Sequence, residues 1–321
     1  MKKPTIYITR KIPEELLEPY KEQCNFTMWH KEDTPVPKDI LYEEVKHADG
    51  LICLITEKID AAFLDHAAHL SVIANMAVGY DNIDIAKAKE HGIVVTNTPD
   101  VLTETTADLT FSLLMATARR IVEAASYIKE DKWGDWAPFM LAGTDIHSKT
   151  IGIVGMGRIG EAVGKRAKGF GMDILYHNRT RHESLEKKLD ATYVPFQTLL
   201  TEADFVVSLV PLTEETEELF NEAAFRKMKS SAIFINASRG GVVDEQALYE
   251  ALRNGYIHAA GLDVFKEEPI NSSHPLNQLS NVTLLPHIGS ASVQTREKMI
   301  QLCLDNVSRV CHEQKAVTPV E

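Results

Sequence analysis

The chain has 321 residues, enough for two domains, and its 44% hydrophobic and 25% charged residues are typical of a globular protein in water. Its formal net charge of -12 argues against nucleic acid as a partner, although a local cluster of positive charge could still bind a small anion. The four cysteines lack metal-ligand or disulfide spacing, the N-terminus lacks an apolar signal core, and no segment is apolar for long enough to cross a membrane. We therefore expect a cytoplasmic protein with no metal site.

Strands alternate with helices along the first hundred residues. Apolar runs predict strands at 5–9, 50–55, 71–77 and 93–96. Helical periodicity predicts helices at 13–20, 39–47, 61–68 and 86–90. This alternation is typical of a parallel sheet that helices cover on both faces.

The rest of the chain repeats this pattern after a long helical region. We predict a helix at 103–118 that continues through 119–131, and then an aromatic loop at 133–139. A buried strand opens the glycine-rich segment 151–160; further strands are expected at 173–176, 205–209, 232–236, 259–262 and 282–285, and helices at 197–201, 222–227 and 245–254. A final helix at 290–313 could return to the first unit. Residues 100–287 would then be a domain inserted between residues 1–99 and 288–321.

The glycine-rich segment carries the pattern of a dinucleotide-binding turn between a strand and a helix. Gly155 permits the turn, Gly157 lets the backbone approach a pyrophosphate, and Gly160 lets the helix pack on the strand. Arg158 and Ile159 open the helix, whose N-terminal N–H groups attract phosphate. The alternative is a purely structural turn.

The end of the next strand indicates which dinucleotide is bound. NAD-binding folds place an acidic residue there for the ribose 2′-hydroxyl, whereas this chain has Asn178, followed by Arg179, Thr180 and Arg181. Arginines and a hydroxyl would bind a 2′-phosphate. We therefore predict a preference for NADPH, with NADH as a second cofactor. The alternative is that the two arginines are ordinary charged residues of a loop and bind no phosphate.

Three polar residues follow strands that should end at one edge of the sheet. Arg239 can bind a carboxylate with two hydrogen bonds, His287 can exchange a proton near neutral pH, and Glu268 would orient and charge that histidine. Singly, each could be an ordinary loop residue. Together they predict a catalytic set for a carboxylate-bearing substrate.

Over essentially its full length the chain resembles the D-isomer-specific 2-hydroxyacid dehydrogenase family. The matching segments are 77–84, 155–160, 210–216, 236–241, 261–269 and 286–290. The resemblance implies two Rossmann-like domains: a doubly wound parallel-sheet nucleotide-binding domain inserted in a discontinuous flavodoxin-like substrate domain. It also implies hydride transfer to a 2-oxo acid, with Arg239, Glu268 and His287 as the catalytic residues.

The resemblance extends to binding residues. It assigns the substrate carboxylate to the backbone of Val78 and Gly79, and it assigns cofactor contacts to six further positions: Thr106, Pro211, Thr216, Ala237, Asp263 and Ser290.

Within the family, the chain is most similar to glyoxylate/hydroxypyruvate reductases, including those that act on 2-ketogluconate. This similarity implies a homodimer with a dimerisation arm at about 103–145, from which Trp136 would reach the partner's active site; the alternative is that Trp133 and Trp136 only fill the interface. Which acid fits would depend on the room left by Leu54, Met76, Met140 and Trp136. The alternative function is that of an NAD(P)H-sensing dimeric interaction protein of the corepressor type.

Overall fold

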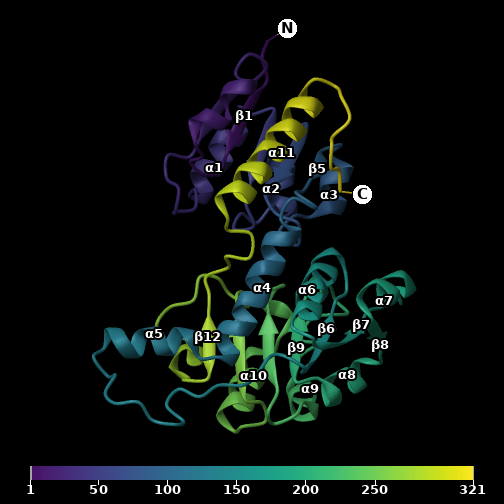
Figure 1. Ribbon diagram of the computed structural model, residues 1–321. Helices are drawn as coiled ribbons and strands as arrows, with labels where there is room; N and C mark the ends of the chain where they lie inside the picture. Colours follow the sequence, from purple (N-terminus) through teal and green to yellow (C-terminus); the bar gives the residue numbers. More distant parts are fainter. Residues whose placement is uncertain (1, 321) are drawn as a thin grey trace. The chain divides into compact units, whose positions relative to one another are not determined.

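The computed structural model describes residues 2–320, and within them the chain divides into two compact units. One unit joins the chain up to Leu102 to the segment from Ala291 onward, and the other is Thr103–Ser290. The second unit is thus inserted, in sequence, within the first. Each unit contains one wholly parallel sheet with helices around it (Figure 1).

The sheet of the first unit has five strands in the order β2-β1-β3-β4-β5. Their bounds are β1 (Thr5–Ile8), β2 (Asn25–Met28), β3 (Gly50–Cys53), β4 (Val72–Asn75) and β5 (Val94–Thr96). This is the flavodoxin-like strand order.

Alternation along the strands gives this sheet two apolar faces. Leu51 and Ile73 pack in the cluster beneath α1 (Lys38–Val45), α2 (Ala61–His66) and α3 (Ile85–Glu90). Ile52 and Val72 pack on the opposite face with α11 (Val293–Cys311), beside the 3-10 turns η1 (Glu14–Leu16) and η2 (Glu18–Tyr20). The last helix therefore completes the hydrophobic core of the first unit.

The segment after α11 pairs with the edge of the same sheet. Thr96 and Pro319 form an antiparallel bridge, and the N–H of Val320 donates to the carbonyl of Val95 at 2.8 Å. This pairing covers the outer side of β5, where an uncovered strand would offer unpaired backbone groups.

The sheet of the second unit has seven strands in the order β12-β11-β10-β9-β6-β7-β8. Their bounds are β6 (Thr150–Val154), β7 (Asp173–His177), β8 (Ala191–Tyr193), β9 (Phe205–Ser208), β10 (Ile233–Asn236), β11 (Ala259–Leu262) and β12 (Val282–Leu284). The order reverses between β6 and β9, and ligands of doubly wound sheets bind at such a point.

Helices cover both faces of this second sheet (Figure 1). One face carries α4 (Thr103–Ala118), α6 (Arg158–Gly169) and the end of α7 (Glu183–Leu189). The other carries α8 (Phe196–Glu202), α9 (Glu222–Lys227) and α10 (Glu245–Arg253). The 3-10 turns η3 (Gly240–Val242) and η4 (Pro275–Gln278) add Val242 and Leu276 to the core on this second face. The helix α5 (Ile121–Lys129) has no buried residue and lies outside these layers. The predicted fold class, two Rossmann-like domains with one inserted in the other, is confirmed.

Two predicted helices are wrong in detail. The helix predicted at 13–20 is the pair η1 and η2, because Pro19 has no N–H to donate to the preceding turn. The helical region 103–131 breaks at Arg120, whose φ of 53° lies in the left-handed region, so that α4 and α5 are separate helices. Three further elements, β2, α7 and β8, were not predicted from the sequence.

Candidate active site

The glycine turn lies between β6 and α6, and each glycine meets a different environment. A Cβ on Gly155 would lie 2.6 Å from the carbonyl carbon of Leu209, and its φ of 102° also favours glycine. A Cβ on Gly160 would lie 2.4 Å from the Gly155 oxygen, whereas one on Gly157 would meet nothing within 4 Å. The N-cap residue of α6 is Gly157, which has no side chain to cap the helix N-terminus. The turn thus leaves open space in front of a helix N-terminus, which fits a pyrophosphate.

Asn178, at the end of β7, is bound to this turn. Its Oδ1 accepts a hydrogen bond from the N–H of Met156 at 2.6 Å, and its Nδ2 donates to the Met156 carbonyl at 3.2 Å. An aspartate could accept the first bond but could not donate the second. The carboxamide therefore holds the turn against β7 without placing a negative charge there.

The two arginines after Asn178 have different surroundings. Arg181 forms two hydrogen bonds with Glu186, both at 2.7 Å. That pairing, together with Tyr176, lowers the pKa of Glu186 to about 2. Arg179 is 86% exposed and forms a 3.6 Å ion pair with Glu215, which is 73% exposed. Of the two guanidinium groups, that of Arg179 is more available to a ligand. Thr180 lies between them and is exposed.

The other positions assigned to the cofactor lie on the same unit. Thr216 closes the loop after β9: its Oγ1 donates to the Pro211 carbonyl at 2.6 Å and accepts from the N–H of Thr213 at 2.8 Å. Thr106 is buried in α4. A Cβ on Gly289 would lie 3.4 Å from its Cγ2, so α4 packs on the segment before Ser290. Ala237 follows β10, and Arg158 and Ile159 form the first turn of α6.

His287 and Glu268 form a direct pair on the loops that follow the neighbouring strands β12 and β11. The Nδ1 of His287 lies 2.7 Å from the Oε2 of Glu268, and the N–H of Phe265 donates to the other carboxylate oxygen at 2.9 Å. Because a carboxylate only accepts, Nδ1 carries the hydrogen in this pair. The second ring nitrogen, Nε2, is then the one that can exchange a proton with a ligand.

Arg239 lies on the loop that follows β10, at the start of η3, and β10 is adjacent to β11. The Nδ2 of Asn236 donates to the Arg239 carbonyl at 3.0 Å, and Nη1 of Arg239 donates to the Ser238 carbonyl at 2.9 Å. A Cβ on Gly240 would lie 1.8 Å from the carbonyl carbon of Phe265. This close approach brings the Arg239 loop against the loop that carries Glu268.

The charges of these groups influence one another. Burial acts to raise the pKa of Glu268, but the hydrogen bond and charge of His287, the N–H of Phe265 and the charge of Arg239 outweigh it, so the pKa lies below its ordinary value. Glu268 is therefore held as a carboxylate. Burial raises the pKa of Asp263, although hydrogen bonds from Ile288 and Gly289 and the charge of His287 act against it.

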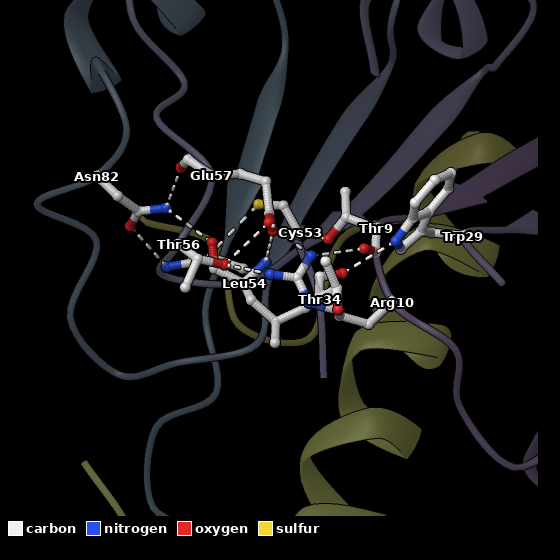
Figure 2. A network of polar contacts seen from close by, with 10 residues as sticks. Thr9, Arg10, Trp29, Thr34, Cys53, Leu54, Thr56, Glu57 and Asn82 are labelled. Carbon is white, nitrogen blue, oxygen red and sulfur yellow. Dashed lines mark hydrogen bonds and ion pairs between the residues drawn. The ribbon is translucent and has the colours of Figure 1, made fainter. Parts of the chain in front are cut away.

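The predicted substrate-binding residues Leu54, Val78 and Gly79 lie in the first unit, on the loops that follow the adjacent strands β3 and β4. The N–H of Leu54 donates to Oε2 of Glu57 at 2.8 Å (Figure 2). Glu57 is in turn paired with Arg10 at 2.8 Å, and both side chains are buried. A buried ion pair thus holds the turn that carries Leu54.

Sequence reasoning missed three asparagines that bind these two loops. Asn75 and Asn97 lie at the ends of β4 and β5, and Asn82 lies in the segment between those strands. Their side chains bond to the carbonyls of Gly79, Val78 and Leu54, respectively. Asn75 and Asn97 each follow an apolar run in the sequence, and this position could have identified them as residues that bind a loop after a strand.

Exposed apolar side chains lie on α5 and on the segment that follows it. Trp136 is 78% exposed and Phe139 is 87% exposed, and on α5 Ile121, Val122 and Ile128 are each at least half exposed.

Two kinds of site find no candidate in the part of the chain that the structure describes. Among residues 2–320, no group of three or more histidine, cysteine or acidic side chains could hold a metal ion. Nor does any helix within that range combine the length and the apolar character needed to span a bilayer.

Comparison with known proteins decides the family. The profile of the "D-isomer specific 2-hydroxyacid dehydrogenase, NAD binding domain" matches residues 111–289. The chain belongs to this family. It is therefore an NAD(P)-dependent oxidoreductase with a Rossmann fold, as the sequence resemblance implies.

The relatives of this dehydrogenase match it along nearly its whole length. A glyoxylate reductase of Korarchaeum cryptofilum is 51% identical over 306 residues, which cover 95% of this chain and 92% of that protein. The structure of the TT0316 protein from Thermus thermophilus matches with a TM-score of 0.92 at 43% identity, covering 99% and 100% of the two chains. An NADPH-dependent glyoxylate/hydroxypyruvate reductase of Sinorhizobium meliloti, in complex with NADP and malonate, matches with a TM-score of 0.86 at 36% identity, covering 99% and 97%.

Proposed function

We propose that this dehydrogenase reduces small 2-oxo acids to D-2-hydroxy acids, with glyoxylate and hydroxypyruvate as substrates and 2-ketogluconate as a larger candidate. The observation that carries the proposal is the 2.7 Å pair between His287 and Glu268, next to the strand end that bears Arg239. The names of the matched reductases from Korarchaeum cryptofilum and Sinorhizobium meliloti support these substrates.

Each catalytic residue has a separate task. A bound reduced nicotinamide supplies the hydride for the C2 carbonyl. His287, protonated, gives its proton to the C2 oxygen as the alkoxide forms, and Glu268 stabilises the imidazolium and fixes its orientation. Arg239 and the N–H groups of Val78 and Gly79 bind the substrate carboxylate.

For the cofactor we propose a preference for NADPH, with NADH also accepted. Phosphates would lie at Gly155, Gly157 and Gly160, and a 2′-phosphate would lie near Arg179, whose guanidinium is the more available. Asn178 supports this preference because it holds the turn without the charge that would repel a phosphate. Thr180 and Arg181 would complete the pocket, and six further positions would contact the cofactor elsewhere: Thr106, Pro211, Thr216, Ala237, Asp263 and Ser290.

We further propose that the first unit, residues 1–99 plus 288–321, binds the acid, and that residues 100–287 bind the dinucleotide. The exposed apolar surface of α5 and the loop with Trp136 supports a dimerisation arm at about 103–145 and hence a homodimer. A reducing compartment such as the cytoplasm suits the four free cysteines.

The test is a substrate panel followed by the absorbance of the reduced cofactor, with NADPH and NADH measured separately. We expect turnover of glyoxylate and hydroxypyruvate, and D-glycerate as the product from the latter. The corepressor-type sensor would instead show no turnover with any 2-oxo acid, together with cofactor-dependent binding of a protein partner.

A further inference from the structure

Two asparagine side chains fix the backbone of the loop that follows β4. The Nδ2 of Asn97 donates to the carbonyl of Val78 at 2.8 Å. The Nδ2 of Asn75, which is fully buried, donates to the carbonyl of Gly79 at 2.9 Å. The loop 77–80 is not part of a strand, so these side chains replace the partners that a sheet would supply.

Fixing a carbonyl also fixes the N–H of the next residue. The peptide group is planar and trans, so its C=O and N–H point in opposite directions. The bond from Asn97 to the Val78 carbonyl therefore turns the N–H of Gly79 to the other side of the loop. The bond from the N–H of Thr98 to the Ala77 carbonyl, 2.8 Å, does the same for the N–H of Val78. Within residues 2–320, neither of these two N–H groups donates to a protein acceptor.

The C-terminal segment holds Asn97 in place. The Oγ1 of Thr318 donates to the Asn97 carbonyl at 2.7 Å, and the N–H of Asn97 donates back to the Thr318 carbonyl at 3.3 Å. Asn306, fully buried in α11, donates to Thr318 Oγ1 at 2.9 Å and accepts from the N–H groups of Val317 and Thr318. A continuous series of hydrogen bonds therefore runs from α11 to the loop.

A second series holds Asn75 from the other side. Its Nδ2 also donates to Oδ1 of Asn82 at 3.2 Å, and the Nδ2 of Asn82 donates to the carbonyls of Leu54 and Glu57 at 3.1 and 3.0 Å. Figure 2 shows Asn82 directed at the Leu54–Glu57 turn, with Arg10 on the far side of Glu57. The two loops assigned to the substrate are thus joined through side-chain amides.

We propose that Asn97 is a positioning residue for the substrate carboxylate: it orients the N–H of Gly79 toward the carboxylate, and Thr318 of the C-terminal segment keeps it in that position. This inference rests on the proposed function, because it takes the acid to bind at Val78 and Gly79. A purely structural role for Asn97 would affect stability alone, whereas a positioning role affects the binding of the acid.

The decisive variant is Asn97→Asp, which keeps the size of the side chain but cannot donate to the Val78 carbonyl when ionised. The repulsion between the two oxygens would turn the peptide and misdirect the N–H of Gly79. Thr318→Val is the second variant, because it removes the hydroxyl between Asn97 and Asn306 with little change in shape. Ser308→Ala is the matched control: it removes a buried hydroxyl of α11 itself, one that donates to Gln23 instead of to the C-terminal segment.

The readouts separate binding of the acid from folding and from binding of the cofactor. We would measure KM for glyoxylate, kcat, KM for NADPH, and the malonate-induced rise in Tm with and without NADP. For Asn97→Asp we expect KM for glyoxylate to rise about tenfold or more, the size of one lost hydrogen bond to a charged group, with malonate affinity falling in parallel. We expect kcat and KM for NADPH to stay within about threefold of the wild-type values. The lost bond to the acid would contribute equally to the ground state and the transition state, so its loss raises KM for the acid without changing kcat. Thr318→Val should raise KM for glyoxylate about threefold.

The proposal is overturned if a folded Asn97→Asp protein keeps the wild-type KM for glyoxylate and the wild-type malonate shift. If Asn97→Asp does not fold, Thr318→Val decides, and a KM equal to that of Ser308→Ala overturns the proposal. If the wild type reduces no 2-oxo acid, the proposed function fails. In that case malonate binding alone tests this inference: it survives if Asn97→Asp abolishes the malonate shift, and it fails if the wild type shows no shift.

Discussion

Asp263 accepts hydrogen bonds from the backbone N–H groups of His287 and of the next residue, Ile288. The N–H of His287 donates to the Asp263 carbonyl at 2.8 Å, and the N–H of Ile288 donates to Oδ1 of the same residue at 2.8 Å. His287 has a φ of 52°, a left-handed conformation that is uncommon for residues other than glycine. These bonds hold the strained backbone, and the bond to Glu268 holds the ring.

The first prediction concerns Asp263→Asn. Burial raises the folded-state pKa of Asp263, so its favourable contribution to stability is complete below the unfolded pKa and is lost as pH rises through the folded value. The amide can still accept from Ile288, but its NH2 group cannot accept the second bond, from Gly289, and it carries no buried charge. We expect the free energy of unfolding of the variant to depend less on pH than that of the wild type, in urea unfolding at several pH values. An unchanged pH dependence would contradict the raised pKa of Asp263 in the folded protein.

Glu268→Gln tests the pair with His287. The folded-state pKa of Glu268 is lowered, so its contribution to stability is present above the unfolded pKa and is lost as pH falls through the folded value. The variant should be less stable than the wild type at neutral pH, and the two should converge in acid. Without the carboxylate the imidazolium loses the partner that orients it, so kcat for reduction at neutral pH should fall about 10- to 100-fold. A kcat equal to that of the wild type would contradict the assigned role of the pair.

Replacing the two arginines separately tests the 2′-phosphate assignment. Arg179→Ala should raise KM for NADPH about 10- to 100-fold, the effect of one lost charge-assisted hydrogen bond, and should leave KM for NADH nearly unchanged. Arg181→Ala should have a smaller effect on NADPH, because its guanidinium is paired with Glu186. Steady-state kinetics with both cofactors measures this, and equal effects of Arg179→Ala on both cofactors would exclude the assignment.

Gly240→Ala tests the contact that brings the Arg239 loop to the Glu268 loop. Its Cβ would lie 1.8 Å from a Phe265 backbone carbon, so one of the loops must move. We expect a loss of about 1–3 kcal/mol in the free energy of unfolding and a marked fall in kcat/KM. Gly169→Ala is the control, since a Cβ there meets nothing within 4 Å. Equal effects from the two substitutions would show that the close approach does not matter.

Much of the fold follows from local patterns. The apolar runs of β9 and β10 and the glycine turn after β6 predict a doubly wound sheet, because buried parallel strands leave a strong signal. The weaker signals belong to the missed elements. β2 is an edge strand with the exposed residues Asn25 and Thr27, and α7 has only two leucines, Leu185 and Leu189, among charged residues.

The candidate site, too, can be predicted from the sequence only in part. The sequence places Arg239, Glu268 and His287 after neighbouring strands, but it cannot show which atoms meet. The separate environments of Arg179 and Arg181 depend on Glu186 and Glu215. The support given to the Val78 carbonyl depends on Asn97 and Thr318, which are 221 residues apart in the chain, and such long-range pairings have no local signal.

The most direct test of the proposed mechanism is the turnover of His287→Ala with NADPH and glyoxylate at neutral pH, with cofactor binding measured in the same preparation. We predict that kcat falls about 10²- to 10⁴-fold, the range for loss of a general acid, while NADPH still binds. Wild-type turnover by a folded His287→Ala protein would contradict the role of His287 as the proton donor.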